Sequence, residues 1–253
     1  MSRPARPKFV VESALSLLDR FLVTLFTPEC AGCRSRVEHG NACATCLELT
    51  PIIAPYCERC GEPTSETIKR CGSCPTRFVR ELSSIRSLWW LTDESRTLWY
   101  RVKYGHRRDL TRSFRKLLER DFTTPILGKN AIIPVPVHIR KYLDRGFNQA
   151  EEIATWIARL TEAPLIVNGL IKVKPTMAQT GLSRAMRLRN LAGSLKWNVK
   201  INAPERVLLI DDVVTTGSTL NRCARVLVKH GVKEVVAWTM FRTPKWLPGS
   251  ERG

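Results

Sequence analysis

The sequence has no apolar run long enough to cross a bilayer, which excludes a membrane-spanning protein. The most apolar N-terminal stretch, residues 9–26, is interrupted by charged residues, and no small-residue cleavage site follows it. Its apolar residues recur at helical spacing, so residues 1–27 are expected to form an amphipathic helix that docks on the protein. With no export signal, we expect a cytoplasmic protein; association with the inner face of the membrane is the alternative.

Acidic residues are scarce, because 23 Asp and Glu stand against 41 Lys and Arg, for a net charge of +18. Such an excess favours anionic partners: nucleic acid, nucleotide phosphates or an acidic membrane surface. The Walker phosphate-binding pattern is also missing. Gly128-Lys129 is followed by Asn130, and Thr123 stands where the first glycine is required. The charge therefore indicates a class of partner without locating a site.

Cysteine is abundant, and eight of the nine cysteines form four C-x-x-C pairs in the first third of the chain. Two adjacent pairs supply four thiolates, which is enough for one tetrahedral zinc ion. A disulfide framework would require an exported protein, and four tandem pairs argue against a redox motif. We therefore expect one or two structural zinc ions in a double zinc ribbon over residues 28–77, with interleaved pairing left open. Sequential pairing predicts one site from Cys30, Cys33, Cys43 and Cys46, and another from Cys57, Cys60, Cys71 and Cys74.

The run 207–210 is leucine-rich and β-branched, which is typical of a central strand in a parallel sheet. Two acids follow it, and a hydroxyl-rich loop with Gly217 then begins a helix. Ligands bind beyond the carboxyl ends of such strands, and the free N–H groups of a helix start attract anions. Paired acids beside a phosphate loop suit a ribose 5-phosphate; the alternative is an ordinary capped turn. The candidate residues are Asp211, Asp212, Val213, Val214, Thr215, Thr216, Gly217, Ser218 and Thr219.

Two further segments carry basic residues suited to a phosphate ligand. The apolar run 131–137 predicts a strand ending at the same sheet edge, followed by a basic loop that contains Arg140 and Arg145. This loop suits a pyrophosphate, and its alternative is a solvated basic turn. The segment from Gln179 to Asn190 is expected to be either a mobile loop that covers the ligand or an exposed basic helix.

The periodicity of the remaining chain predicts an α/β fold with a mainly parallel sheet over residues 78–245, followed by a tail over 246–253. The expected strands are 82–91, 131–137, 166–173, 207–210 and 232–240, and the expected helices are 95–104, 109–122, 148–160 and 218–230.

Aromatic and basic residues alternate after residue 85, which is the recipe for binding single-stranded DNA: cations for phosphates and rings for bases. The alternative is that the rings pack in the core. The residues are Trp89, Trp90, Trp99, Tyr100 and Tyr104, among Arg86, Arg96, Arg101, Lys103, Arg107 and Arg108.

Together these features resemble the ComF family, also called GntX-like proteins, which look like a zinc ribbon fused to a type I phosphoribosyltransferase fold. The resemblance covers nearly the whole chain, and its motifs occur in the family's order. They are the four C-x-x-C pairs, Lys103-Tyr104-Gly105, Pro134-Val135-Pro136, the run from Arg145 to Ala150, Gln179 with Arg187 and Asn190, and Asp211 to Thr219.

The resemblance implies a site for phosphoribosyl pyrophosphate (PRPP) bound with Mg²⁺. The two acids would contact the ribose hydroxyls, the loop from Thr215 to Thr219 would hold the 5-phosphate, and the loop after Pro136 would face the pyrophosphate. The residues expected around the pyrophosphate and in the covering loop are Lys103, Arg140, Arg145, Gln179 and Arg187.

The family is associated with natural transformation or with the use of imported DNA as a nutrient. The resemblance therefore implies a protein that handles internalised single-stranded DNA, beside a helicase-like partner or recombination proteins. The alternative is an active phosphoribosyltransferase of nucleotide metabolism, whose acceptor no sequence feature identifies. Docking of a protein partner on the zinc ribbon is a third interpretation, compatible with either.

Overall fold

The computed structural model describes residues 28–37, 41–53, 55–72, 74, 80–105, 107, 109–122, 131–173 and 195–244. The predicted helix over 1–27, the segment with Gln179 and Arg187, and the tail over 246–253 lie outside these residues. Within the described part of the chain, no helix has the length and apolar character needed to cross a membrane.

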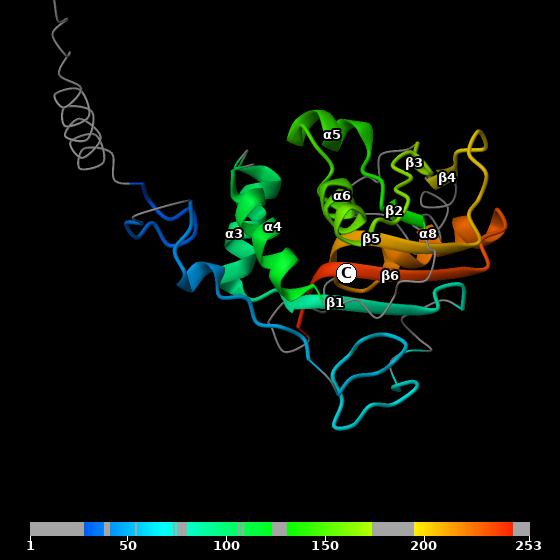
Figure 1. Ribbon diagram of the computed structural model, residues 1–253, viewed down its shortest axis with the longest axis horizontal. Coiled ribbons are helices and arrows are strands. Elements are labelled where there is room, and N and C mark those ends of the chain that lie inside the picture. The colour runs from blue at the N-terminus through cyan, green and yellow to red at the C-terminus, as the bar shows by residue number, and fades with distance from the viewer. Residues whose placement is uncertain are drawn as a thin grey trace, which may run out of the picture.

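A four-stranded parallel sheet forms the centre of the protein, in the order β1-β6-β5-β2 (Figure 1). In the central strands, residues 207–210 of β5 and residues 235–242 of β6 are buried, as expected when both faces of a sheet are covered. The predicted α/β fold with a mainly parallel sheet is confirmed. The strands are β1 (Ser84–Trp90), β2 (Ala131–Pro134), β5 (Arg206–Val214) and β6 (Glu234–Arg242).

Helices cover both faces of this sheet. Leu208 of β5 shares one core cluster with Ile157 of α6, and the next residue, Leu209, shares the other cluster with Leu227 of α8. Because successive side chains of a strand point to opposite faces, α6 and α8 lie on opposite sides of the sheet. Figure 1 shows α6 above the sheet and α3 and α4 at one end. The helices are α3 (Asp93–Tyr104), α4 (Leu110–Asp121), α5 (Ile139–Arg145), α6 (Gln149–Thr161) and α8 (Ser218–Lys229), with a 3₁₀ turn η1 (Thr45–Leu47).

The helix starts follow from local sequence. In α3, the Thr92 side chain accepts a hydrogen bond from the backbone N–H of Ser95, and acidic residues occupy the first turn, where they complement the helix dipole. In α6, the Asn148 side chain accepts from the N–H of Ala150 and also donates to the Val135 carbonyl. Asn148 therefore ties the start of α6 to the chain that leaves β2.

Two predictions for the chain between β2 and β5 need correction. The basic segment after Pro136 forms a short helix, α5, rather than a loop. The predicted strand 166–173 shrinks to β3 (Leu170–Lys172), which pairs antiparallel with the unpredicted β4 (Leu195–Trp197) outside the main sheet. Packing decides this pairing, because the Trp197 ring lies against Gly169, where an added Cβ would stand 2.9 Å from it.

Candidate functional site

The eight paired cysteines gather into two sets of four. Within each set, all four Sγ atoms lie within 4.8 Å of one another. Four Sγ–Sγ contacts of 3.5–3.7 Å match the edge of about 3.8 Å expected for a tetrahedron with Zn–S bonds of about 2.3 Å. The two clusters are consistent with two structural zinc sites, and sequential use of the pairs is confirmed. The first cluster is Cys30, Cys33, Cys43 and Cys46, and the second is Cys57, Cys60, Cys71 and Cys74.

Backbone N–H groups point at the sulfur atoms in both clusters. The N–H of Cys43 lies 3.2 Å from Cys30 Sγ, and the N–H of Cys71 lies 3.2 Å from Cys57 Sγ. Burial raises the pKa of the Cys57 thiol, but these donors outweigh it and lower the pKa to about 6. The Cys57 thiolate, which is the form that binds zinc, is therefore stabilised before the metal arrives, whereas burial raises the pKa of the Cys60 and Cys74 thiols beside it.

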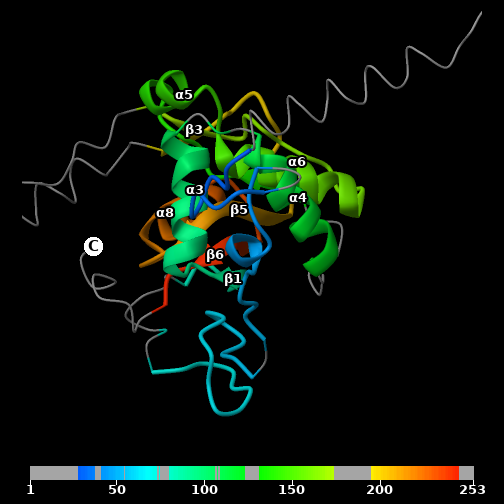
Figure 2. The ribbon, with the colours of Figure 1, turned by 90° about the vertical axis from the view of Figure 1, so that its left-hand side faces the viewer.

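The two clusters attach to different parts of the fold. The first lies beside α3, where Cys46 shares a core cluster with Leu98, and the second lies below β1 (Figures 1 and 2). The second is tied to the sheet by Arg242 at the end of β6, which donates to the Cys60 carbonyl and pairs with Glu62 at 3.4 Å. The cysteine module is therefore fixed to the sheet rather than tethered beside it.

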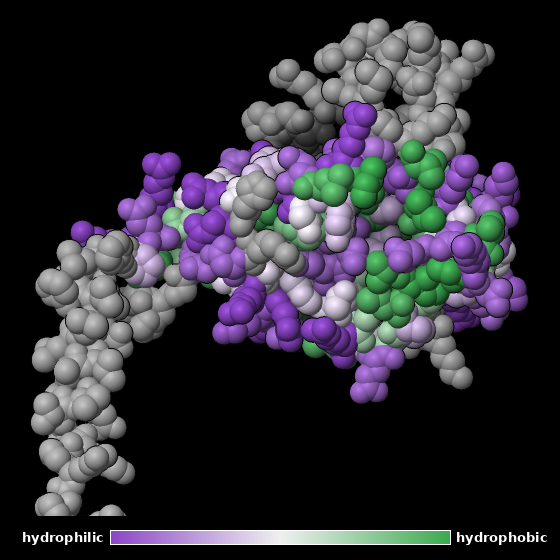
Figure 3. Space-filling view, turned by 90° about the horizontal axis from the view of Figure 1, so that it is seen from above, coloured by the Kyte–Doolittle hydropathy of each residue, from purple (hydrophilic) through white to green (hydrophobic). Residues whose placement is uncertain are grey.

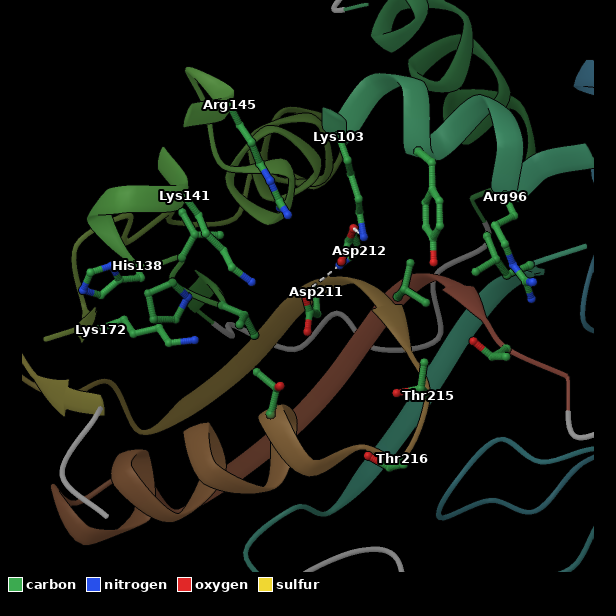
Figure 4. Close-up of a pocket in the computed structure, with 18 residues that line it drawn as sticks. Arg96, Lys103, His138, Lys141, Arg145, Lys172, Asp211, Asp212, Thr215 and Thr216 are labelled. Carbon is green, nitrogen blue, oxygen red and sulfur yellow. Dashed lines mark hydrogen bonds and ion pairs between the residues drawn. The ribbon is translucent and has the colours of Figure 1, made fainter. Parts of the chain in front are cut away.

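A cavity of about 550 Å³ opens at the carboxyl ends of the parallel strands (Figure 4). The walls come from α3, the segment after β2, α5, β3, the end of β5, the start of α8 and the end of β6. The described residues that line it are Leu91, Arg96, Tyr100, Lys103, Val135, Pro136, Val137, His138, Lys141, Arg145, Lys172, Asp211, Asp212, Val213, Thr215, Thr216, Thr219 and Thr243.

The two acids lie within β5, not after it as the sequence predicted. The ladder with β6 continues as far as Val214, whereas β2 ends at Pro134, opposite Ile210. Residues 211–214 of β5 therefore pair on one side only, and their open side borders the cavity. This arrangement exposes Asp211 and Asp212 to a ligand while the backbone stays held in the sheet.

The acid pair is asymmetric. Lys103 Nζ lies 2.5 Å from Asp212 Oδ2, and Trp99 Nε1 donates to the same oxygen at 2.9 Å. Burial alone would raise the pKa of Asp212, but Lys103 and Trp99 hold it below the ordinary value. Burial and the Asp212 charge raise the pKa of Asp211 to about 8. At neutral pH the ligand-free cavity therefore holds a neutral Asp211 beside an ionised, paired Asp212.

The hydroxyl-rich loop lies on one side of the acid pair, where Figure 4 shows Thr215 and Thr216. Gly217 begins α8 in the left-handed conformation, with φ at 77°, which a side chain would disfavour. Gly217 offers no side-chain cap, and the Ser218 N–H donates to Thr216 Oγ1 at 3.4 Å; the other N–H groups of the first turn could bind an anion.

Cations gather on the opposite side of the acid pair. Lys141 and Lys172 lie there in Figure 4, beside the His138 ring, and Arg145 descends from α5. Burial and the like charges of Arg222 and Lys141 lower the pKa of Lys172. An anion bound among these side chains would relieve that repulsion.

Most of the predicted ligand residues meet at the cavity. Those that line it are Asp211, Asp212, Val213, Thr215, Thr216, Thr219, Lys103 and Arg145, whereas Val214, Gly217, Ser218 and Arg140 do not. Lys103, expected near the pyrophosphate, forms an ion pair with Asp212 in the ligand-free cavity. Lys172 was missed because nothing in its local sequence marks it, whereas His138 follows the β2 run directly and could have been found from that position. Their roles in ligand binding stay predictions.

The aromatic residues divide into two groups. Trp89 and Trp99 are buried in the core against Phe241, so for them the packing alternative is correct. Tyr100 and Tyr104 of α3 are 47% and 59% exposed, and Tyr100 lines the cavity.

Strand order, helical layers and a ligand cavity at the strand ends define a phosphoribosyltransferase-like α/β protein with zinc-ribbon clusters. The family models agree: the double zinc ribbon domain matches residues 21–75, and the phosphoribosyl transferase domain matches residues 174–246. The chain belongs to the ComF family, and its phosphoribosyltransferase domain implies a ligand of the PRPP type.

Curated relatives match over most of their length. Competence protein F of Haemophilus influenzae is 29% identical over 243 residues, covering 87% of this chain and 100% of that protein. DNA utilization protein YhgH of Escherichia coli is 25% identical, covering 81% and 92%. Competence protein ComFC of Bacillus subtilis is 26% identical, covering 80% and 85%. A solved glutamine PRPP amidotransferase from B. subtilis covers 56% of this chain and 26% of its own, at 20% identity and a TM-score of 0.34, too low to carry an argument.

Proposed function

We propose that the cavity binds PRPP, with the 5-phosphate on the loop from Thr215 to Thr219 and the ribose hydroxyls at the acid pair. The diphosphate then lies among Lys141, Arg145 and Lys172. The observation that carries this proposal is the order of charges across the cavity: phosphate loop, acid pair, cation cluster. That order matches the order of phosphate, sugar and diphosphate in the ligand.

Mg²⁺ would accompany this ligand, because it commonly binds through phosphates and one or two carboxylates. Asp211 is the carboxylate that fits, since Asp212 is already paired with Lys103. Bound there, the ion would offset the charge of the diphosphate. Ionisation of Asp211 would be favoured by the ion and by rising pH.

The proposed role is the handling of single-stranded DNA that enters the cell, in transformation or DNA utilisation. Support comes from the names of the relatives, two competence proteins and a DNA utilization protein, and from the net charge of +18. A helicase or recombination protein would be the partner in this role. The cytoplasm is the proposed compartment, because its reducing conditions keep eight zinc-binding thiols reduced.

Titration calorimetry with PRPP and Mg²⁺ tests the site. Wild type is expected to bind, and Asp211→Asn is expected to weaken binding at least about 100-fold, because it removes the proposed metal and ribose contact. Glu205→Gln is the matched charge control, since Glu205 is exposed and pairs with Lys233 outside the cavity.

Equal binding by the Asp211→Asn variant would overturn the site assignment, and absence of binding by wild type would overturn the ligand. Pyrophosphate release in the same samples, with single-stranded DNA or free nucleobases added, distinguishes a binding protein from an active phosphoribosyltransferase.

A further inference from the structure

Two exposed tyrosines lie on the last turns of α3: Tyr100 lines the cavity, and Tyr104 contacts Arg145, which also lines it. Tyr100 and Tyr104 are one helical turn apart, with ring centroids 5.9 Å apart and perpendicular planes. Nearby tryptophans of the same sequence region are buried in the core. More than half of the Tyr104 side chain stays in water, although the core next to it accepts aromatic rings. An exposed ring of this kind at a cavity rim is typical of a ligand-binding position.

Arg145 from α5 stacks on one of these rings. Its guanidinium carbon lies 4.5 Å from the centre of the Tyr104 ring, and its Nη1 donates to Gln149 Oε1 at 3.3 Å. Arg145 also lines the cavity, and Figure 4 shows it descending toward the acid pair as Lys103 descends from α3. The Arg145 guanidinium therefore connects the Tyr104 ring to the lining of the cavity.

We propose that Tyr104 and Arg145, with Tyr100 at their edge, form a stacking platform for a base of single-stranded nucleic acid. This platform places the adjoining phosphates of the strand toward Lys141 and the cation cluster. This proposal rests on the proposed function for the role of the cavity. It adds the place where the single-stranded nucleic acid binds. Bases stack on aromatic rings and on guanidinium planes, and only an unpaired strand presents a free base face.

The chemistry of the surface favours a nucleic acid over a protein partner. Cations alternate with the rings at the platform, namely Lys103, Arg145 and Lys141, so both bases and phosphates find contacts. The exposed apolar side chains Ile139 and Leu143 lie on α5, on the upper face of the protein. Figure 3 shows apolar groups on that face separated by hydrophilic side chains.

One turn of α3 connects the platform to the acid pair of β5, because it carries both Tyr104 and Lys103. Tyr104 follows Lys103 directly, and Lys103 pairs with Asp212 inside the cavity. A sugar that engages Asp212 competes with Lys103 and so perturbs the turn that presents Tyr104. Linkage requires the coupling to be reciprocal: PRPP changes the affinity for the strand by the same factor as the strand changes the affinity for PRPP.

Fluorescence anisotropy with a labelled oligothymidylate tests the platform without PRPP. The second probe is a strand of equal length made of abasic sites, which keeps the phosphates and removes the bases. Tyr104→Ala is expected to weaken oligothymidylate binding by about fivefold or more, in line with the loss of one base stack, and to leave abasic binding unchanged. Tyr104→Phe, which keeps the ring, is expected to restore wild-type affinity.

Tyr142→Ala is the matched control, because Tyr142 is also exposed, at 41%, but lies on α5 outside the cavity lining and the Tyr104 stack. Zinc content and circular dichroism establish that each variant is folded. Equal losses for both probes, or no loss for either, would overturn the platform and favour a protein partner for this surface. Because these titrations omit PRPP, the result stands whether or not the cavity binds that ligand.

The coupling has its own test, made with PRPP and Mg²⁺ added at saturation. Wild-type affinity for oligothymidylate is expected to shift at least about threefold, and Lys103→Met is expected to remove that shift. An affinity that PRPP leaves unchanged in a wild-type protein shown to bind PRPP would overturn the coupling and leave the platform intact.

Discussion

The cysteine clusters and the cavity both bring together side chains suited to a charged ligand. Each cluster draws on a short stretch of sequence, whereas the cavity draws on residues that lie far apart in the chain. Each cluster takes its four thiols from fewer than 20 consecutive residues, for example 57 to 74. The cavity takes its lining from residues between Leu91 and Thr243, on α3, α5, β3 and β5. The clusters are thus local structures that the metal completes, whereas the cavity exists only after the sheet has formed.

This difference predicts opposite effects on stability. The free energy of zinc binding contributes to folding, so a lost cysteine ligand destabilises the protein. A ligand cavity instead holds groups whose burial is unfavourable until the ligand binds, as the raised pKa of Asp211 shows. Four substitutions can break or sharpen the comparison.

The largest effect is expected for Cys57→Ser. Cys57 is completely buried in the second cluster, which Arg242 ties to β6. Loss of its zinc is expected to lower the free energy of unfolding by about 4 kcal/mol or more. Elemental analysis and urea unfolding measure both quantities. Cys223→Ser is the control, because Cys223 lies in α8 outside both clusters and its loss should leave the zinc content intact. Full zinc content in Cys57→Ser would contradict the assigned ligand.

Asp212→Asn is expected to be the most destabilising change in the cavity. It leaves the Lys103 ammonium, whose side chain is 14% exposed, without its carboxylate partner. We expect a loss of about 3 kcal/mol, measured by urea unfolding at pH 7. The double variant Asp212→Asn with Lys103→Met should recover part of this loss. If the Asp212→Asn variant were as stable as the wild type, the ion pair with Lys103 would make no contribution to the free energy of unfolding.

Asp211→Asn is expected to act in the opposite direction from Asp212→Asn. The folded protein holds the Asp211 proton up to about pH 8, whereas the unfolded chain releases it near 3.8. The free energy of unfolding of the wild type therefore falls as the pH rises from 3.8 to about 8. The Asp211→Asn variant does not lose this stability, because its amide does not titrate. The stability advantage of the variant over the wild type should therefore grow by roughly 1 kcal/mol per pH unit between pH 5 and pH 8. Thermal unfolding at both pH values checks the sign, and a difference independent of pH would contradict it.

The smallest expected effect tests the contact between the first cluster and α3. A Cβ at Gly32 would stand 2.6 Å from Cys46 Sγ and 3.4 Å from Leu98, whereas nothing lies within 4 Å of a Cβ at Gly72. Gly32→Ala is expected to destabilise by about 1 kcal/mol and to speed zinc release to a chromogenic chelator. Gly72→Ala, the matched control, should release zinc at the wild-type rate. Equal rates for both variants would show that the first cluster adjusts freely.

Local features were predictable wherever neighbouring residues carry the signal. The cysteine spacing predicted both clusters, and the apolar run before Asp211 predicted the central strand. Errors arose where a partner element decides the outcome. The acids lie inside β5 because β6 extends the ladder past the end of β2. The short β3 pairs with β4 because Gly169 receives the Trp197 ring.

Thiol spacing and apolar periodicity act over a few residues, so the sequence alone specifies the two cysteine clusters, the central strand and the hydroxyl-rich loop after it. The partners of the acid pair depend on distant segments. Lys103 reaches Asp212, Lys172 joins the cation side, and Tyr104 meets Arg145 only when α3, β3 and α5 pack around β5. Charge pairing and burial depend on distances in space, and those distances exist only once the sheet and its helices have come together.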